Sequence, residues 1–243
     1  MGHFGYFALI SAAMFSGAVV SGTIGFGFAA IAGVIMLHVM PPIEAVPLMM
    51  VCSVPVQISS LFAVVRGVQW KRCLVFAAGG LLGVAPAIYL LQHLDTDLFR
   101  AAFGVLIAAY AGYMLFRTAT APKPHAGGVI GAGLVGFGGG LIGGLTGMPG
   151  ALPSIWCDLH GLSKDEQRGV VQPFILVVQL IALVLLMPHI AWSSTMLTHL
   201  AISLPALAAG TAVGIMLFGR IDNVLFRRVV LGTLCVSGLV LAV

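Results

Sequence analysis

The sequence predicts an all-helical protein that crosses the membrane several times and is built from two related halves of opposite orientation. Three observations predict this fold class. Hydrophobic residues make up 60% of the 243-residue chain and charged residues only 7%, whereas a soluble domain carries about 25% charged residues. The chain also repeats itself with an offset of 122 positions. Finally, equivalent loops of the two copies differ in their basic residues, as loops on opposite sides of a membrane do.

Rare polar residues carry the internal repeat. At the 122-residue offset, the matched pairs are His38 and His160, Glu44 and Glu166, Gln57 and Gln179, and Trp70 and Trp192. After a shift of five more residues, Leu98-Phe99-Arg100 matches Leu225-Phe226-Arg227. So many ordered matches in an apolar chain indicate an internal duplication. We therefore divide the chain into a first membrane repeat at 1–116, a linker at 117–127 and a second membrane repeat at 128–243.

Each half is predicted to begin with an apolar stretch that glycine interrupts, and three membrane helices follow. In the first half these elements lie at 4–39, 44–65, 73–92 and 98–116. In the second half they lie at 128–158, 166–187, 195–218 and 224–243. An interrupted stretch exceeds the roughly 20 residues that one span needs. Each one therefore predicts two short helices or a re-entrant hairpin.

Basic residues in the loops predict the orientation. The loop 66–72 holds Arg66, Lys71 and Arg72, which indicates the cytoplasmic side, and its equivalent at 188–194 has no Lys or Arg. Conversely, the loop 219–228 holds three arginines, whereas its equivalent at 92–100 has one Arg and two Asp. Equivalent loops on opposite sides are typical of inverted repeats. We expect a multi-pass protein of the cell (inner) membrane with both termini on the non-cytoplasmic side.

A glycine cluster interrupts the first stretch of each half. The two clusters read Gly22-Thr23-Ile24-Gly25-Phe26-Gly27-Phe28 and Gly144-Leu145-Thr146-Gly147-Met148-Pro149-Gly150. Paired breaks of this kind indicate a transporter's substrate site. A helix that restarts after a break points unpaired N–H groups and a positive dipole end into the cavity. Two such ends would form an anion site without Lys or Arg. The alternative is that these glycines only permit close helix packing.

The predicted substrate site takes residues from both breaks and from the following helices. From the breaks it includes Thr23, Gly25, Phe26, Gly27, Thr146, Gly147, Met148, Gly150 and Ser154. The hydroxyl residues Thr23, Thr146 and Ser154 either donate to a bound oxyanion or cap the half-helices. Gln57, Gln172 and Gln179 join the site because polar residues within a membrane are functional by default. The alternative for them is interhelical hydrogen bonding, worth about 1 kcal/mol.

A second group of polar residues lies near the predicted helix ends. Its members are His38, Glu44, His160, Glu166 and Arg168. Ser163 is predicted to cap a helix with acidic residues in its first turn, which accounts for Glu166 without a transport role. The alternative is a gate or a proton relay, since histidine titrates near physiological pH. We therefore name these five residues as gating or coupling candidates.

Other function classes find little support in the residues. The four cysteines form no CxxC pair, so neither a metal cage nor a disulfide framework is expected. No basic run suits nucleic acid, and no HExxH or P-loop motif predicts a cofactor or an enzyme. An intramembrane enzyme using Cys157 with His160 and Glu166 lacks the pattern of an activated nucleophile.

The chain resembles the TauE/SafE family of sulfite exporters over nearly its whole length. The most specific stretch runs from Gly138-Gly139-Gly140-Leu141-Ile142-Gly143-Gly144 through the second break to Gly161-Leu162-Ser163-Lys164-Asp165-Glu166-Gln167-Arg168. The chain departs from the family pattern at Phe26-Gly27-Phe28-Ala29 and at Met148-Pro149. The resemblance implies transport of small sulfur-containing anions such as sulfite, sulfonates or thiosulfate. We expect a secondary transporter in the lipid bilayer with a small anionic substrate and no cofactor; an anion channel is the alternative.

Overall fold

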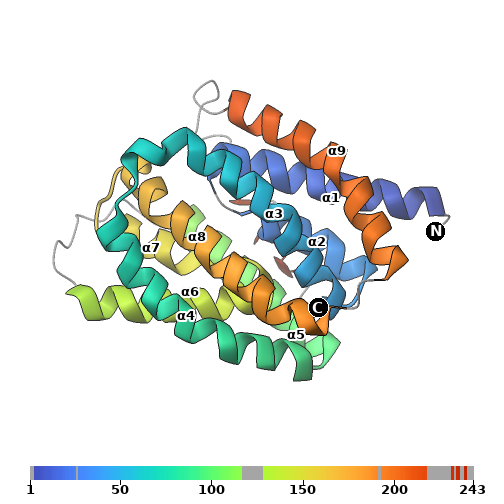
Figure 1. Ribbon diagram of the computed structural model, residues 1–243, viewed down its shortest axis with the longest axis horizontal. Helices are drawn as coiled ribbons and strands as arrows, with labels where there is room; N and C mark the ends of the chain where they lie inside the picture. The colour runs from blue at the N-terminus through green and yellow to red at the C-terminus, as the bar shows by residue number, and fades with distance from the viewer. Residues whose placement is uncertain are drawn as a thin grey trace.

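The described residues of the computed structural model fold into helices joined by short connections (Figure 1). The structure describes residues 3–25, 27–116, 128–190 and 193–217, together with 231–232, 234–235 and 238–239. The first half contains α1 (His3–Ile24), α2 (Phe28–Val39), α3 (Pro42–Val64), α4 (Trp70–His93) and α5 (Thr96–Phe116). The second half contains α6 (Gly128–Thr146), α7 (Ala151–Leu159), α8 (Lys164–Leu186) and α9 (Ser194–Leu217). Two 3₁₀ turns, η1 (Val65–Gly67) and η2 (Met187–His189), follow α3 and α8.

The structure confirms the helical fold and refines the interrupted stretches. Instead of two short helices, each stretch has a long helix and then a short one. The long helices α1 and α6 have 22 and 19 residues, whereas α2 and α7 have 12 and 9. Because a span needs roughly 20 residues, only α2 and α7 are half-helices. The predicted linker 117–127, the predicted helix 224–243 and Trp192 lie outside the described residues, apart from the six residues within 231–239.

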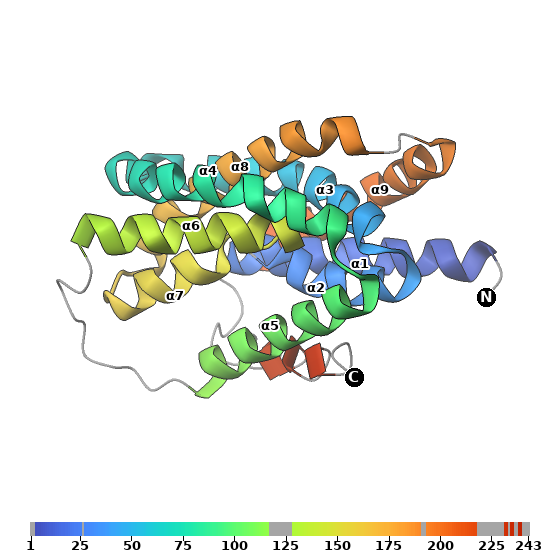
Figure 2. The ribbon, with the colours of Figure 1, turned by 90° about the horizontal axis from the view of Figure 1, so that it is seen from below.

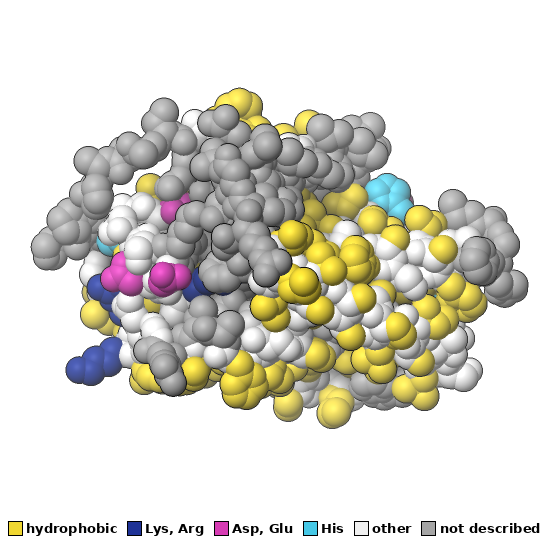
Figure 3. Space-filling model, turned by 90° about the horizontal axis from the view of Figure 1, so that it is seen from above, with side chains coloured by type: hydrophobic (Ala, Val, Ile, Leu, Met, Phe, Trp, Pro, Cys, Tyr) yellow, Lys and Arg dark blue, Asp and Glu magenta, His cyan; other side chains and the backbone are white. Residues whose placement is uncertain are grey.

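The chain is a multi-pass membrane protein. Among the described residues, seven helices are long and apolar enough to cross a membrane. Large apolar side chains on these helices are exposed, including Phe62 at 74%, Leu82 at 73% and Ile130 at 79%. Figure 3 shows apolar side chains over a broad part of one face, with charged side chains gathered near one end. A lipid environment accounts for this distribution, since such apolar exposure in water would favour aggregation.

Helices of the two halves pack against each other reciprocally. The first helix of each half lies along the fourth helix of the other half, so α1 packs on α9 and α6 packs on α4. Helices α3 and α8 contact each other between these two pairs (Figures 1 and 2). Helices α3 and α8 also begin 122 positions apart, at Pro42 and Lys164. The packing is what two related halves would give; their inverted orientation and the domain boundaries stay predictions.

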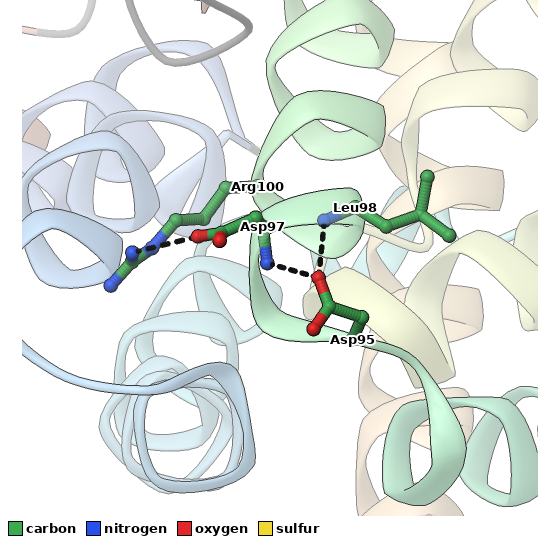
Figure 4. Close-up of polar contacts among 4 residues, drawn as sticks. All are labelled: Asp95, Asp97, Leu98 and Arg100. Carbon is green, nitrogen blue, oxygen red and sulfur yellow. Dashed lines mark hydrogen bonds and ion pairs between the residues drawn. The ribbon is translucent and has the colours of Figure 1, made fainter.

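Local side-chain bonds fix the starts of two helices. At α5, the Oδ1 atom of Asp95 accepts hydrogen bonds from the N–H groups of Asp97 and Leu98 at 2.9 and 3.2 Å (Figure 4). Asp97 pairs with Arg100 at 3.6 Å in the same view. At α8, Ser163 and Glu166 form a complete capping box, which confirms the predicted cap. These carboxylates therefore stabilise helix N-termini.

Glycines allow α4 and α6 to approach closely, and this contact predicts a stability effect. A Cβ atom at Gly140 would overlap the backbone of Gly80, whereas one at Gly133, also on α6, would meet nothing within 4 Å. We expect Gly140→Ala to lower stability by about 1–3 kcal/mol through overpacking. Gly133→Ala is the matched control and should leave stability unchanged or slightly raised. Thermal unfolding in detergent measures both; equal melting temperatures would contradict the close contact.

Candidate functional site

The two interruptions share one backbone geometry. Gly25 has φ +96° and Gly147, 122 positions later, has φ +71°. Side chains with a Cβ atom rarely adopt this left-handed region, so glycine is favoured at both positions. The N–H group of each glycine donates to the carbonyl four residues earlier, Ser21 or Gly143, at 2.8 Å in both cases. Helices α1 and α6 therefore end in the same way, and the chain then turns into a half-helix.

The N-termini of both half-helices line the same cavity. Residues at the start of α2 and α7 face it together with side chains from α3 and α8; the lining residues are Gly27, Phe28, Ala29, Gln57, Gly147, Met148, Pro149, Gly150, Ile175 and Gln179. The N-cap residues of the half-helices, Gly27 and Gly150, have no side chain that could cap the first N–H groups. The first N–H groups of each half-helix lack intrahelical partners and carry partial positive charge. The cavity therefore has the chemistry of an anion site.

The cavity is small. It offers about 10 Å³ to the centre of a water molecule, which is room for about one water. No Lys or Arg is among the described residues that line it. Its polarity comes from the two helix ends and from the amide groups of Gln57 and Gln179. An oxyanion of several heavy atoms needs the walls to move apart before it fits.

Two glutamines connect the cavity to the helices around it. The amide of Gln179 donates to the carbonyl of Gly147 at 3.1 Å and accepts from the Ser53 hydroxyl at 2.7 Å. The amide of Gln57 donates to the Ser21 hydroxyl at 3.4 Å, and its Oε1 atom is buried without a partner among the described residues. Gln57 and Gln179 are each 2% exposed. The Nε2 atom of Gln57 carries two N–H groups, so one of them can donate to an anion while the other bonds Ser21.

Arg168 and Gln172 on α8 donate hydrogen bonds to backbone carbonyls at the first break. The guanidinium of Arg168 donates to the carbonyl of Thr23 at 2.8 Å, and Gln172 donates to the carbonyl of Gly25 at 3.4 Å. The last carbonyls of a helix lack intrahelical partners, and a cation beside them is favourable. Neither side chain is among those that line the cavity. Arg168 is buried within the protein although it lies in the second turn of α8.

The three predicted hydroxyl residues lie beside the cavity without lining it. Thr23 donates to the carbonyls of Val19 at 2.7 Å and Gly214 at 3.3 Å. Thr146 donates to the carbonyl of Ile142 at 2.7 Å and accepts from the N–H group of Met148 at 3.3 Å. Ser154 is buried, with no partner for its hydroxyl among the described residues. None of the three is an N-cap of a half-helix, so their direct contact with substrate stays a prediction.

The remaining gating candidates lie at helix ends. His38 and Glu44 are exposed near the end of α2 and the start of α3. The Nδ1 atom of His38 lies 2.6 Å from the carbonyl of Val34, and that of His160 lies 2.8 Å from the carbonyl of Trp156. These two contacts are equivalent under the 122-residue offset. None of the described gating candidates lines the cavity, and their gating or coupling role stays a prediction.

Sequence reasoning placed most of the cavity residues but left several out. Phe26, a predicted site residue, lies outside the described residues. The structure adds Ser21 and Ser53 as partners of the two glutamines. The spacing of four positions places Ser53 on the same helix face as Gln57, but no local pattern showed that Ser53 would contact Gln179 or that Ser21 would contact Gln57. In the apolar wall, Phe28, Ala29 and Pro149 lie within or next to the predicted glycine clusters, whereas Ile175 had no comparable signal.

One comparison with known proteins finds a match. A family model described as Sulfite exporter TauE/SafE matches residues 9–241, which is nearly the whole chain. The matched region includes both breaks and all three predicted glutamines. No curated protein and no solved structure matches the chain.

Proposed function

The chain belongs to the sulfite exporter TauE/SafE family, and on this premise we propose that it is a secondary transporter of small sulfur-containing anions such as sulfite or an organosulfonate. One observation carries the proposal: the N-termini of both half-helices and the amides of Gln57 and Gln179 line a single cavity. Two partial positive charges and two amide groups suit a small oxyanion. The proposed site comprises these groups, with Arg168 and Gln172 positioning the first break.

Binding without a lining cation has a consequence for transport. A full ion pair in a low-dielectric cavity would hold the anion strongly and slow its release. Helix ends and amides provide attraction that depends on their exact alignment, so a small movement of either break weakens it. We infer that the two halves move apart alternately on each side of the site, as inverted repeats do in other carriers. The small cavity then corresponds to the occluded state of this cycle.

The proposal includes a location and an orientation. The protein lies in the cell (inner) membrane with both termini on the non-cytoplasmic side, and the loop 66–72 faces the cytoplasm. The basic residues of that loop support this orientation. The two membrane repeats at 1–116 and 128–243 are then related by an axis in the membrane plane, with the proposed site between their breaks.

Uptake into proteoliposomes tests the function. Labelled sulfite and a labelled small organosulfonate are each offered with and without a pH gradient. We expect saturable flux that unlabelled substrate competes with, and the faster substrate identifies the preferred class. Dependence on the pH gradient would indicate proton coupling. Protein-free vesicles are the control. Folded protein that carries neither anion would overturn the proposal, and single-channel conductance of many ions per second would indicate a channel instead.

A further inference from the structure

A second, larger cavity lies at the N-terminal ends of α4 and α6, beside the C-terminal end of α7. Its volume is about 460 Å³. Lys71 and Arg72 from the first turn of α4 lie on its wall together with Trp156 and His160 from the end of α7. It shares no lining residue with the cavity between the breaks. The proposed transport function therefore does not account for it.

The two formally charged residues among those that line this cavity, Lys71 and Arg72, are both cations. Lys71 and Arg72 stand in the first turn of α4, which has no acidic residue and whose N-cap, Gln69, makes no side-chain bond. Two cations at the positive end of a helix dipole are unfavourable unless an anion lies nearby. Neither cation forms an ion pair within 4.0 Å in the described part of the chain. Neither Glu166, which interacts electrostatically with Arg72 and accepts two hydrogen bonds of 2.8 Å from Ser163, nor Asp158 at the end of α7 is among the residues that line the cavity.

The remaining walls of the cavity suit a hydrocarbon chain. Val75 lies one turn below Arg72, and Val129 at the start of α6 is 72% exposed on a spanning helix. The ring of Trp156 stacks on His160, with centroids 3.6 Å apart, and packs edge-on against Phe76 at 5.2 Å. Tryptophan is enriched at the depth of lipid headgroups. A small inorganic anion would use the cations but leave this apolar wall unoccupied.

We propose that this cavity binds an anionic phospholipid. Its phosphodiester lies between Lys71 and Arg72, its glycerol lies against Trp156, and an acyl chain runs over Val75 and Val129. The position of both cations in the first turn of a spanning helix matches the depth of headgroup phosphates at the membrane surface. The site is independent of the transported anion, so failure of the transport proposal would leave it standing.

Tryptophan quenching by brominated lipid tests the proposal. The variant Trp70→Phe, Trp192→Phe retains Trp156 as its one tryptophan of the three. It is reconstituted in bilayers of phosphatidylglycerol and phosphatidylcholine, with bromine on one lipid or the other at equal amounts. We expect brominated phosphatidylglycerol to quench Trp156 more strongly. Equal quenching by the two lipids would overturn the proposal.

Charge removal and competition sharpen the test. Lys71→Gln or Arg72→Gln should reduce the preference for phosphatidylglycerol about fivefold each, and the double variant should abolish it. Arg100→Gln is the matched control, because Arg100 lies in the first turns of α5, away from the cavity. A preference that survives in the folded double variant would overturn the proposal. So would loss of the preference on adding sulfite, since the site would then hold a free anion.

Native mass spectrometry of the unmodified chain provides a test that does not depend on the folding of a variant. Purified protein is offered equal amounts of phosphatidylglycerol and phosphatidylcholine in detergent. We expect phosphatidylglycerol to stay bound at higher collision energy. Loss of both lipids at the same energy would contradict a dedicated anionic lipid site.

Discussion

Replacing Gln57 or Gln179 with alanine is expected to lower the affinity for the transported anion by about tenfold to a hundredfold. Both amides line the cavity between the half-helix ends, and a hydrogen bond to a charged group contributes about 1.5–3 kcal/mol. The Gln57→Ala effect should fall mainly on binding, because its amide makes only a long 3.4 Å bond to Ser21. Gln179→Ala should also loosen the second break, because it removes the 3.1 Å bond to Gly147. Concentration dependence of proteoliposome uptake measures both effects.

Two control variants separate substrate binding from structural support. Gln92→Ala makes the same chemical change at the end of α4, away from the cavity, and should leave uptake unchanged. Ser53→Ala removes the 2.7 Å bond to Gln179 but keeps the amide in place, so its effect should be smaller than that of Gln179→Ala. If the Gln57→Ala and Gln179→Ala variants both transport with unchanged affinity, the cavity is not the substrate site.

The position of the breaks could be predicted because two similar glycine clusters stand 122 positions apart in the sequence. Gly25 and Gly147 stand at equivalent positions, and both have positive φ. Their equivalence was visible in the sequence without any structure. The lengths of the helices on either side of each break were harder to predict, because the glycines within α6 do not interrupt that helix. Close packing against α4 supports Gly140 in a helical conformation, so the number of glycines alone does not locate a break.

The role of Arg168 could not be predicted from its position in the sequence. It lies in the second turn of α8, which suggested a membrane face. Its long side chain instead reaches the carbonyl of Thr23 in the other half of the protein. That contact depends on how α8 packs against the end of α1, and no local pattern reports such packing. The direct contact of Gln172 with Gly25 was hidden for the same reason.

The side chains that support the two breaks differ. Under the 122-residue offset, Arg168 corresponds to Val46 and Gln172 corresponds to Met50. Helix α8 therefore contributes polar contacts to both breaks, whereas α3 has no counterpart of Arg168 or Gln172. We infer that side chains of α8 fix the first break. The first break should therefore depend on α8 side chains more strongly than the second break does. A substitution at the first break should accordingly be the more damaging one.

Gly25→Ala is expected to be strongly destabilising and to abolish transport. Its φ of +96° is strained for any residue with a Cβ atom. The added Cβ would also lie 2.9 Å from Nε of Arg168 and 3.1 Å from Nε2 of Gln172, displacing the groups that hold the break. Backbone strain and the lost hydrogen bonds together cost about 2–5 kcal/mol. Thermal unfolding in detergent and uptake into proteoliposomes measure the two effects.

A graded series of glycine substitutions tests whether the strain lies at the breaks. Gly147→Ala should cost less, about 1–2 kcal/mol, because its φ is +71° and the nearest atom to the new Cβ is that of Ala29 at 3.3 Å. Gly112→Ala in α5 adds the same methyl group where nothing lies within 4 Å, and should be neutral or slightly stabilising. Melting temperatures should therefore rise from Gly25→Ala through Gly147→Ala to Gly112→Ala. If Gly25→Ala and Gly112→Ala had the same melting temperature, the first break would not be the constrained element that binding requires.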